Sequence, residues 1–225
     1  GAKSLYSMKS VDFSANQITK VQNGENYKGI NVETLTMTDN PITVYPVEFA
    51  KSKSKIGFVN MRGCRLSDVP KEAFEGENVK YLMSLDFSYN DLNDLPSSFN
   101  AVNMPYFYGL ELSYNEFSKF PFEPLDCYGL TVFGIRGQRD KNGERCLSEW
   151  PTGIYQHVGL RGFYIGSNNL GMINDTISPL CYYLEISDNP DIVFDASGVC
   201  YEYSIGAYYL IYDKTQDVRG CELML

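Results

Sequence analysis

The chain has 225 residues and a formal net charge of −9, with 19 lysines and arginines against 28 acidic residues. This balance argues against a nucleic-acid binder, which needs a basic stripe to neutralise phosphates. No window approaches the ~18 unbroken apolar residues of a membrane-spanning helix, whereas the hydrophobic content of 44% is enough to bury a continuous core.

One sequence pattern recurs from about Met8 to Thr215. In its clearest copies, residues 85–95 and 110–120, two apolar residues stand two positions apart and an asparagine follows three positions later. Side chains two apart lie on the same face of a strand, so each copy predicts a short strand with one buried face. The first residue of this apolar pair recurs every 21 to 30 residues, at Val11, Leu35, Val59, Leu85, Leu110, Phe133, Phe163, Leu184 and Leu210.

The copies predict nine strands, near residues 8–13, 32–37, 56–61, 82–87, 107–112, 130–135, 160–165, 181–186 and 207–212. Connections of a dozen or more residues bring successive strands alongside one another in parallel. A repeated unit of this length is typical of a stacked solenoid. We therefore expect a single domain over residues 1–225, with residues 216–225 as a C-terminal cap.

A polar residue, usually asparagine, follows each predicted strand. A buried amide costs free energy unless its donors and acceptors are all used. We therefore expect these side chains to bond the backbone of neighbouring coils, which is a structural task. The position holds Asn16, Asn40, Asn90, Asn115, Asn168 and Asn189, with Cys64, Gln138 and Thr215 in the three other copies.

The outer part of each copy carries further apolar anchors. Five copies then place a proline after the last anchor, at Pro46, Pro70, Pro96, Pro121 and Pro151. Proline ends strand pairing and fixes the turn onto the outer side. Only residues 70–82 read even weakly as helix, so we expect short helices, 3-10 turns or extended segments there.

These residues resemble the leucine-rich repeat family, whose motif is LxxLxLxxN/CxL, over nearly the whole chain. Cys64 matches the family's alternative to asparagine, and the chain resembles secreted or surface bacterial members of the family. The resemblance implies an α/β solenoid shaped as a right-handed horseshoe, with a parallel β-sheet on its concave face. It also implies a binding module that uses no cofactor and performs no catalysis.

Residues that alternate with the buried strand positions point to the concave side. Two carboxylates become neighbours there, because Asp86 and Glu111 occupy the same position of consecutive strands. Tyrosines gather toward the C-terminal half with two arginines, and both residue types are enriched at binding hot spots. The candidate contact residues are Tyr164, Tyr183, Tyr209, Arg136, Arg161, Asp86 and Glu111.

Our leading interpretation is recognition of a protein or peptide on this face. A glycan is the rival ligand, because Gly134, Gly162 and Gly166 beside the tyrosines leave a hollow for a flat ring or sugar. A rival from another class is an enzyme that uses Asp86 and Glu111 as acid and base. An open, solvated sheet offers no burial to separate their pKa values, which disfavours catalysis. A purely structural spacer is a further alternative.

An insertion of charged residues, 139–146, predicts a hairpin loop at one rim, because Asn142-Gly143 is a tight-turn pair. Three of its residues echo the start of a calcium loop, but the other ligands of that motif are absent, so we expect no metal site.

Two cysteines, Cys64 and Cys181, fall at buried repeat positions and predict internal thiols. Two other couples, Cys127 with Cys146 and Cys200 with Cys221, could each close a disulfide. The single histidine, His157, lies on an outer connection and predicts a surface residue.

The abrupt start at Gly1 looks like a segment cut from a longer protein. Low charge density and abundant Tyr, Asn and Ser favour an extracellular or cell-surface location. A lipid anchor upstream of Gly1 is one route to that location.

Overall fold

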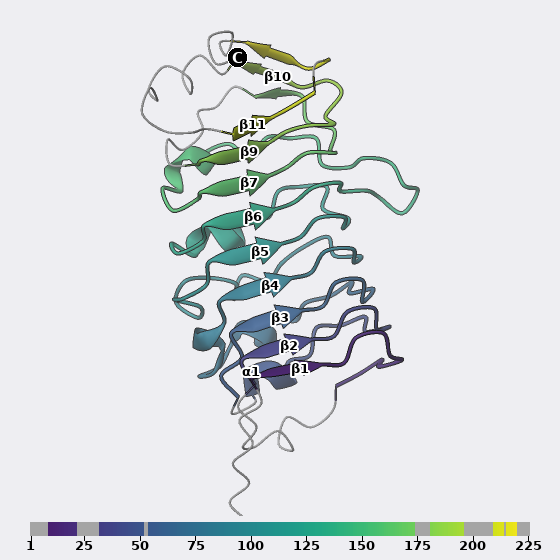
Figure 1. The fold of residues 1–225 in the computed structure, drawn as a ribbon, viewed down its shortest axis with the longest axis vertical. Helices are drawn as coiled ribbons and strands as arrows, with labels where there is room; N and C mark the ends of the chain where they lie inside the picture. Colours follow the sequence, from purple (N-terminus) through teal and green to yellow (C-terminus); the bar gives the residue numbers. More distant parts are fainter. Residues whose placement is uncertain are drawn as a thin grey trace, which may run out of the picture.

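The computed structural model describes residues 9–21, 32–51, 54–173, 181–195, 209–213 and 215–219. Its main element is a nine-stranded parallel sheet in which the strands follow one another in the order β1-β2-β3-β4-β5-β6-β7-β9-β11 (Figure 1). Each strand has three residues: β1 Ser10–Asp12, β2 Thr34–Thr36, β3 Phe58–Asn60, β4 Ser84–Asp86, β5 Gly109–Glu111, β6 Val132–Gly134, β7 Gly162–Tyr164, β9 Tyr183–Glu185 and β11 Tyr209–Ile211. The predicted parallel solenoid is confirmed.

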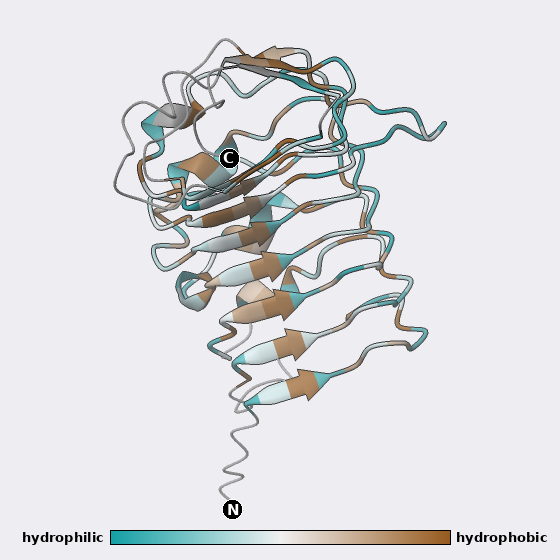
Figure 2. Cartoon of the chain, turned by 45° about the horizontal axis from the view of Figure 1, so that its top comes forward, coloured by the Kyte–Doolittle hydropathy of each residue, from teal (hydrophilic) through white to brown (hydrophobic). Residues whose placement is uncertain are grey.

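The strands are in register, so equivalent residues of successive copies lie side by side. Leu85 pairs with Val59 on one side and with Leu110 on the other. The middle residue of each strand faces the core, and its two neighbours face the concave side. Figure 2 shows the resulting apolar band across the strands.

In the described parts of the connections that lead to the next strand, the helical segments are all short. These are α1 Glu48–Lys51 and the 3-10 turns η2 Lys71–Phe74, η3 Val79–Tyr81, η4 Glu123–Asp126 and η5 Ile154–Gln156. Between the two layers, aromatic rings pack edge to face, as Phe99 does with Phe74 at 4.9 Å and with Phe107 at 5.1 Å. Burial of these rings dominates the apolar stabilisation of the coils.

A second parallel sheet forms in the last coils, where the sequence predicted short helices, 3-10 turns or extended segments. Its order is β12-β10-β8, with β8 Met172–Ile173, β10 Val193–Asp195 and β12 Asp217–Arg219. Earlier in the chain, Val44 and Asp68 make a single parallel bridge. Extended chain beyond the asparagine turn can therefore pair with its neighbour in both halves of the described solenoid.

The buried asparagines join neighbouring coils, as predicted. Asn90 accepts from the backbone N–H groups of Cys64 and Leu66 at 2.9 and 2.8 Å, and its amide nitrogen donates to the carbonyls of Met61 and Phe87, both at 2.9 Å. Gln138 performs the same task, accepting from Phe117 N and donating to Leu112 O.

The last copy corrects the predicted alignment by one residue. We expected Thr215 in the asparagine position, but Gln216 is the residue that donates to the carbonyls of Ile186 and Asn189. Its longer side chain reaches the preceding coil from one position further along the chain.

Backbone with positive φ precedes the asparagine position in each described copy from the first to the eighth. Glycine fills it only at Gly63 and Gly137, and the other residues are Ala15, Asp39, Tyr89, Tyr114, Ser167 and Asp188. The left-handed region disfavours side chains, most strongly bulky ones. Two tyrosines in this conformation therefore mark unusual positions.

Cysteine chemistry follows burial. Cys64, Cys127, Cys146 and Cys181 are free thiols, so the disulfide considered between Cys127 and Cys146 is not formed. Burial raises the pKa of the Cys127 thiol to about 12 and that of Cys181 to about 11. Cys200 and Cys221 lie outside the described residues. Within the described part of the chain, no helix is long and apolar enough to cross a membrane.

Candidate binding surface on the concave sheet

The acidic side chains of the concave face cap their own strands. Asp86 Oδ1 accepts from the backbone N–H and the hydroxyl of Ser88, at 2.9 and 2.6 Å. Glu111 Oε1 accepts from Ser113 N at 2.9 Å. Asn60 Oδ1 accepts from Arg62 N in the same way at 3.0 Å, so an amide oxygen can replace the carboxylate as acceptor.

Asp86 and Glu111 are register partners, as predicted. Each is held by a serine two residues further on, and each keeps a second oxygen for which no hydrogen bond exists among the described residues. They form a pair of adjacent carboxylates on an open sheet, which favours contact with a ligand over acid–base chemistry.

An ion pair occupies the middle of the face. Arg136 Nε donates to Glu185 Oε2 at 2.7 Å, and the Glu185 carboxylate also accepts from the Ser187 hydroxyl and from Gly166 N. The Arg136 guanidinium lies 4.4 Å from the centre of the Tyr164 ring. Because the Glu185 side chain is only 8% exposed, its charge is nearly buried, and the Arg136 guanidinium compensates it.

The predicted glycine hollow is filled, which corrects the basis of the glycan interpretation. A methyl group added at Gly134 would collide with the Glu111 carboxylate, and one at Gly166 would collide with that of Glu185. The Tyr164 ring lies against Gly162, 3.2 Å from where its Cβ would stand. These glycines make room for side chains of the protein itself.

Tyr183 and Tyr209 form the most open aromatic feature of the sheet. Their rings stack 4.7 Å apart with an angle of 7° between their planes, and the residues are 43% and 52% exposed. Tyr183 is the register partner of Gly162, over which Tyr164 folds, so the structure brings the three predicted tyrosines together.

Arg161 does not join this cluster. Its Nη1 donates to the carbonyls of Val158 and Gly159, at 2.8 and 3.0 Å, in the turn before β7. The guanidinium therefore satisfies backbone groups of its own connection. The sequence predicted that Arg161 lies near Arg136 on the binding surface. The direction of its side chain, which the sequence does not reveal, makes it a cap of the turn instead.

The fold of this chain has close counterparts among solved structures. The crystal structure of a leucine-rich repeat protein from Bacteroides thetaiotaomicron covers 99% of this chain with a TM-score of 0.91 and 38% identity, over 28% of its own chain. Another from Bacteroides eggerthii covers 97% with a TM-score of 0.87 and 39% identity, over 38% of its own chain. This chain is a leucine-rich repeat protein.

Sequence comparison agrees with this assignment. Lumican from Bos taurus is 34% identical over 97 residues, which is 42% of this chain and 27% of lumican. No family model matches the sequence. This leucine-rich repeat chain spans 27% to 38% of the length of these three proteins.

One more structure shares the leucine-rich repeat fold. The plant peptide hormone receptor RGFR1 in complex with RGF2 covers 92% of this chain with a TM-score of 0.60, over 32% of its own chain. At 14% identity the likeness concerns the fold alone.

A rim feature that sequence reasoning missed runs beside the concave face of this leucine-rich repeat sheet. Tyr89 and Tyr114, both in the left-handed conformation, stack at 4.3 Å, and the Arg62 guanidinium lies 4.0 Å from the Tyr89 ring centre. Tyr114 rests on Gly137, and partial burial beside Tyr89 raises the pKa of the Tyr114 hydroxyl. The sequence could have indicated this stack, because a tyrosine stands directly before the repeat asparagine in two consecutive copies.

The inserted hairpin projects from the same rim, as predicted (Figure 1). Arg139 and Arg145 make an antiparallel bridge, and Asp140 caps the turn by accepting from the backbone of Asn142 and Glu144. Arg145 then pairs with Asp188 at 2.6 Å, which lowers the pKa of that carboxyl. Among the described residues, no cluster of three or more His, Cys, Asp or Glu could hold a metal ion.

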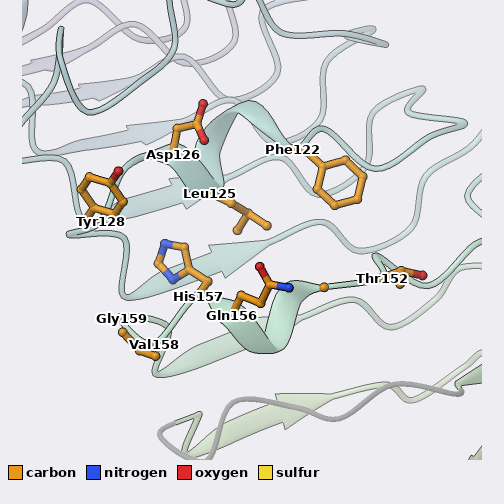
Figure 3. Close-up of a pocket in the computed structure, with 10 residues that line it drawn as sticks. Phe122, Leu125, Asp126, Tyr128, Thr152, Gln156, His157, Val158 and Gly159 are labelled. Carbon is orange, nitrogen blue, oxygen red and sulfur yellow. The ribbon is translucent and has the colours of Figure 1, made fainter.

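The outer side carries a hollow of about 400 Å³ between η4 and η5 (Figure 3). Phe122, Tyr128 and Val158 expose apolar surface around it. His157 lines this hollow but is only 8% exposed and donates from Nε2 to the Cys127 carbonyl at 3.2 Å. The prediction of a surface histidine was wrong, because the ring is buried against the preceding coil, which supplies the Cys127 carbonyl.

Proposed function

We propose that this chain is a non-catalytic recognition module whose concave sheet binds a protein or peptide partner. The observation that supports it most directly is the exposed Tyr183–Tyr209 stack on that sheet. Tyrosine provides a large, rigid contact area at low cost in side-chain entropy, which makes it a frequent hot-spot residue.

Pre-organisation gives further support. Arg136 is fixed by the buried Glu185 and by the Tyr164 ring before any partner arrives. A contact surface that is already ordered loses less entropy on binding. The carboxylates of Asp86 and Glu111 are likewise held by the backbone of their own copies.

The comparisons support binding in general terms. A plant receptor with the same fold was solved in complex with RGF2 and is described as a peptide hormone receptor. We extend that role to this chain as part of the proposal, together with an extracellular or cell-surface location. We also propose that residues 1–225 form one repeat domain with residues 216–225 as its cap.

The test compares two variants in partner capture. Tyr183→Ala/Tyr209→Ala removes the concave stack, whereas Tyr128→Ala removes a ring that is 86% exposed beside the outer hollow. Each protein is used as bait for chemical cross-linking and mass spectrometry on its native secretome. We expect partners that wild type and Tyr128→Ala capture equally and that the double variant loses, with all three melting at similar temperatures.

Equal capture by all three proteins would contradict the proposal. A glycan-array signal that depends on the two concave rings, without a protein partner, would favour the glycan alternative. Arg136 is a poor choice for this test, because its removal leaves Glu185 buried and unpaired, at a cost of about 3–5 kcal/mol in folding free energy.

A further inference from the structure

The concave face carries more negative than positive charge. Three columns of side chains line it: the first and third residues of each strand, and the residue two positions after the strand ends. In the nine copies these columns contain the carboxylates of Asp12, Asp86, Glu111, Glu185 and Asp213, the guanidinium groups of Arg62 and Arg136, and no lysine.

Few of these carboxylates are neutralised within the described structure. Arg136 is committed to Glu185. Arg62 stacks on Tyr89 and reaches Asp86 only through the Ser88 hydroxyl, to which it donates at 3.4 Å. Among the described residues, neither Asp86 nor Glu111 has a cationic group within ion-pair distance.

From this charge distribution we propose that the concave sheet takes a cationic partner, an extended segment rich in lysine or arginine. Its basic groups bind Asp86 and Glu111, and its aliphatic stems lie against Tyr183 and Tyr209. The proposal rests on the proposed function and specifies the chemistry of the partner. Both residue types suit a cation, since carboxylates pair with it and tyrosine rings attract it through their faces.

The geometry suits one short segment. From β5 to β9 the sheet advances by three strand spacings, about 14 Å at ~4.8 Å each. An extended chain of about five residues covers that distance at ~3.3 Å per residue. A segment of eight to ten residues therefore contacts the acidic pair and the tyrosine stack together.

An anionic partner fits less well. The Arg136 guanidinium already shares its charge with Glu185 and stacks on Tyr164, and Arg161 is bonded to carbonyls of its own turn. The Glu111 carboxylate lies against Gly134, which stands two residues before Arg136 in the chain. Glu111 would therefore repel a carboxylate of the partner that approached Arg136. The net charge of −9 adds a long-range field of the same sign, which steers cations toward the chain.

The experiment uses labelled decapeptides in which serine alternates with lysine, with asparagine or with glutamate, and reads binding by fluorescence anisotropy. The test variant is Asp86→Asn/Glu111→Gln, whose amides keep the acceptor oxygens for Ser88 and Ser113, as Asn60 does naturally. The matched control is Glu123→Gln/Asp126→Asn in η4, which removes the same net charge from the outer side.

We expect the lysine peptide to bind wild type and control equally, and the asparagine and glutamate peptides to bind far more weakly. The concave variant should bind the lysine peptide about ten-fold more weakly at 50 mM salt. This difference should shrink toward 1 M salt, where the screening length falls to ~3 Å.

Equal weakening in both variants would show unspecific attraction to an acidic protein and would overturn the inference, as would absence of lysine-peptide binding. These outcomes leave the partner-capture result for Tyr183→Ala/Tyr209→Ala untouched. A partner that Tyr183→Ala/Tyr209→Ala loses but Asp86→Asn/Glu111→Gln still binds would therefore contradict only the cationic chemistry of the partner, and not the proposed function.

Discussion

Buried amide side chains hydrogen-bond the main-chain groups of neighbouring coils. The amide of each buried asparagine accepts from at least one main-chain N–H and donates to at least two main-chain carbonyls; Asn90 accepts from two. Gln138 and Gln216 show that the amide matters more than the length of the side chain. Asn16 in the first copy is exposed and bonds only Phe13 O and Ser14 O of its own turn.

Replacement of a buried member of this set should therefore be costly. Asn90→Ala leaves backbone groups of Cys64, Leu66 and Met61 without partners. At about 1–3 kcal/mol for each buried unpaired group, we expect a loss of roughly 3–5 kcal/mol in unfolding free energy, measured by urea denaturation. Asn16→Ala is the control and should change stability by less than about 1 kcal/mol. Similar losses in both variants would mean that the inter-coil bonds contribute little.

At the scale of one element, the turn after each strand determines which side chains lie at the rim of the sheet. Its left-handed residue carries tyrosine in the fourth and fifth copies, despite the conformational cost. Stacking of Tyr89 on Tyr114 and on Arg62 offsets part of that cost. Gly137 in the next copy completes the arrangement, because a side chain there would occupy the place of the Tyr114 ring.

Three glycine substitutions separate conformational strain from collision. Gly137→Ala places a methyl group at φ +60 and 2.6 Å from the Tyr114 ring, whereas Gly143→Ala, at φ +83, meets open space. Gly171→Ala has neither strain nor neighbour. We expect about 1–2 kcal/mol for strain alone at Gly143, a larger loss at Gly137 and almost none at Gly171, measured by thermal unfolding. Equal losses at Gly137 and Gly143 would show that the ring does not pack there.

The whole molecule is a stack in which each coil buries its apolar side against its neighbours, so its interior is continuous from end to end. The free thiols lie in or against this interior, and burial raises their pKa values. A raised pKa keeps the thiol protonated in the folded state while the unfolded chain releases its proton. This stabilisation is complete below the unfolded pKa near 8.5 and is lost as the pH rises toward the folded value.

Stability should therefore fall as the solution becomes alkaline. Above about pH 9 we expect a loss of up to about 1.4 kcal/mol per pH unit from Cys127, whose folded pKa is about 12. Urea midpoints at pH 7 to 10 measure it, and Cys127→Ala should show a shallower decline. In a Cys200→Ser/Cys221→Ser background, iodoacetamide should label Cys146 first and the buried Cys127 and Cys181 only on unfolding. A decline that is identical with and without Cys127 would contradict the assignment.

Periodicity in the sequence was enough to determine the fold of this chain. Apolar residues two apart, repeated every two dozen residues with an asparagine at a fixed offset, allow a parallel stack with few alternatives. The same regularity placed Asp86 beside Glu111 and Tyr183 beside Tyr209, because register follows directly from the repeat. The irregular last copy was misaligned by one residue, at Gln216, since a two-residue strand pattern alone does not determine the length of a turn.

Side-chain direction was decided by the tertiary structure alone. The sequence grouped Arg136, which follows β6, with Arg161, which precedes β7, yet Arg161 caps a turn and Arg136 pairs with Glu185 from two strands away. The glycines appeared to leave a hollow until the carboxylates and ring of neighbouring copies were seen to fill it. His157 appeared exposed in the sequence, but its ring is buried and bonds the Cys127 carbonyl of the preceding coil. For Arg136, the glycines and His157, contacts between copies override what one copy implies. Arg161 instead bonds the turn just before it, which its position in the sequence did not reveal.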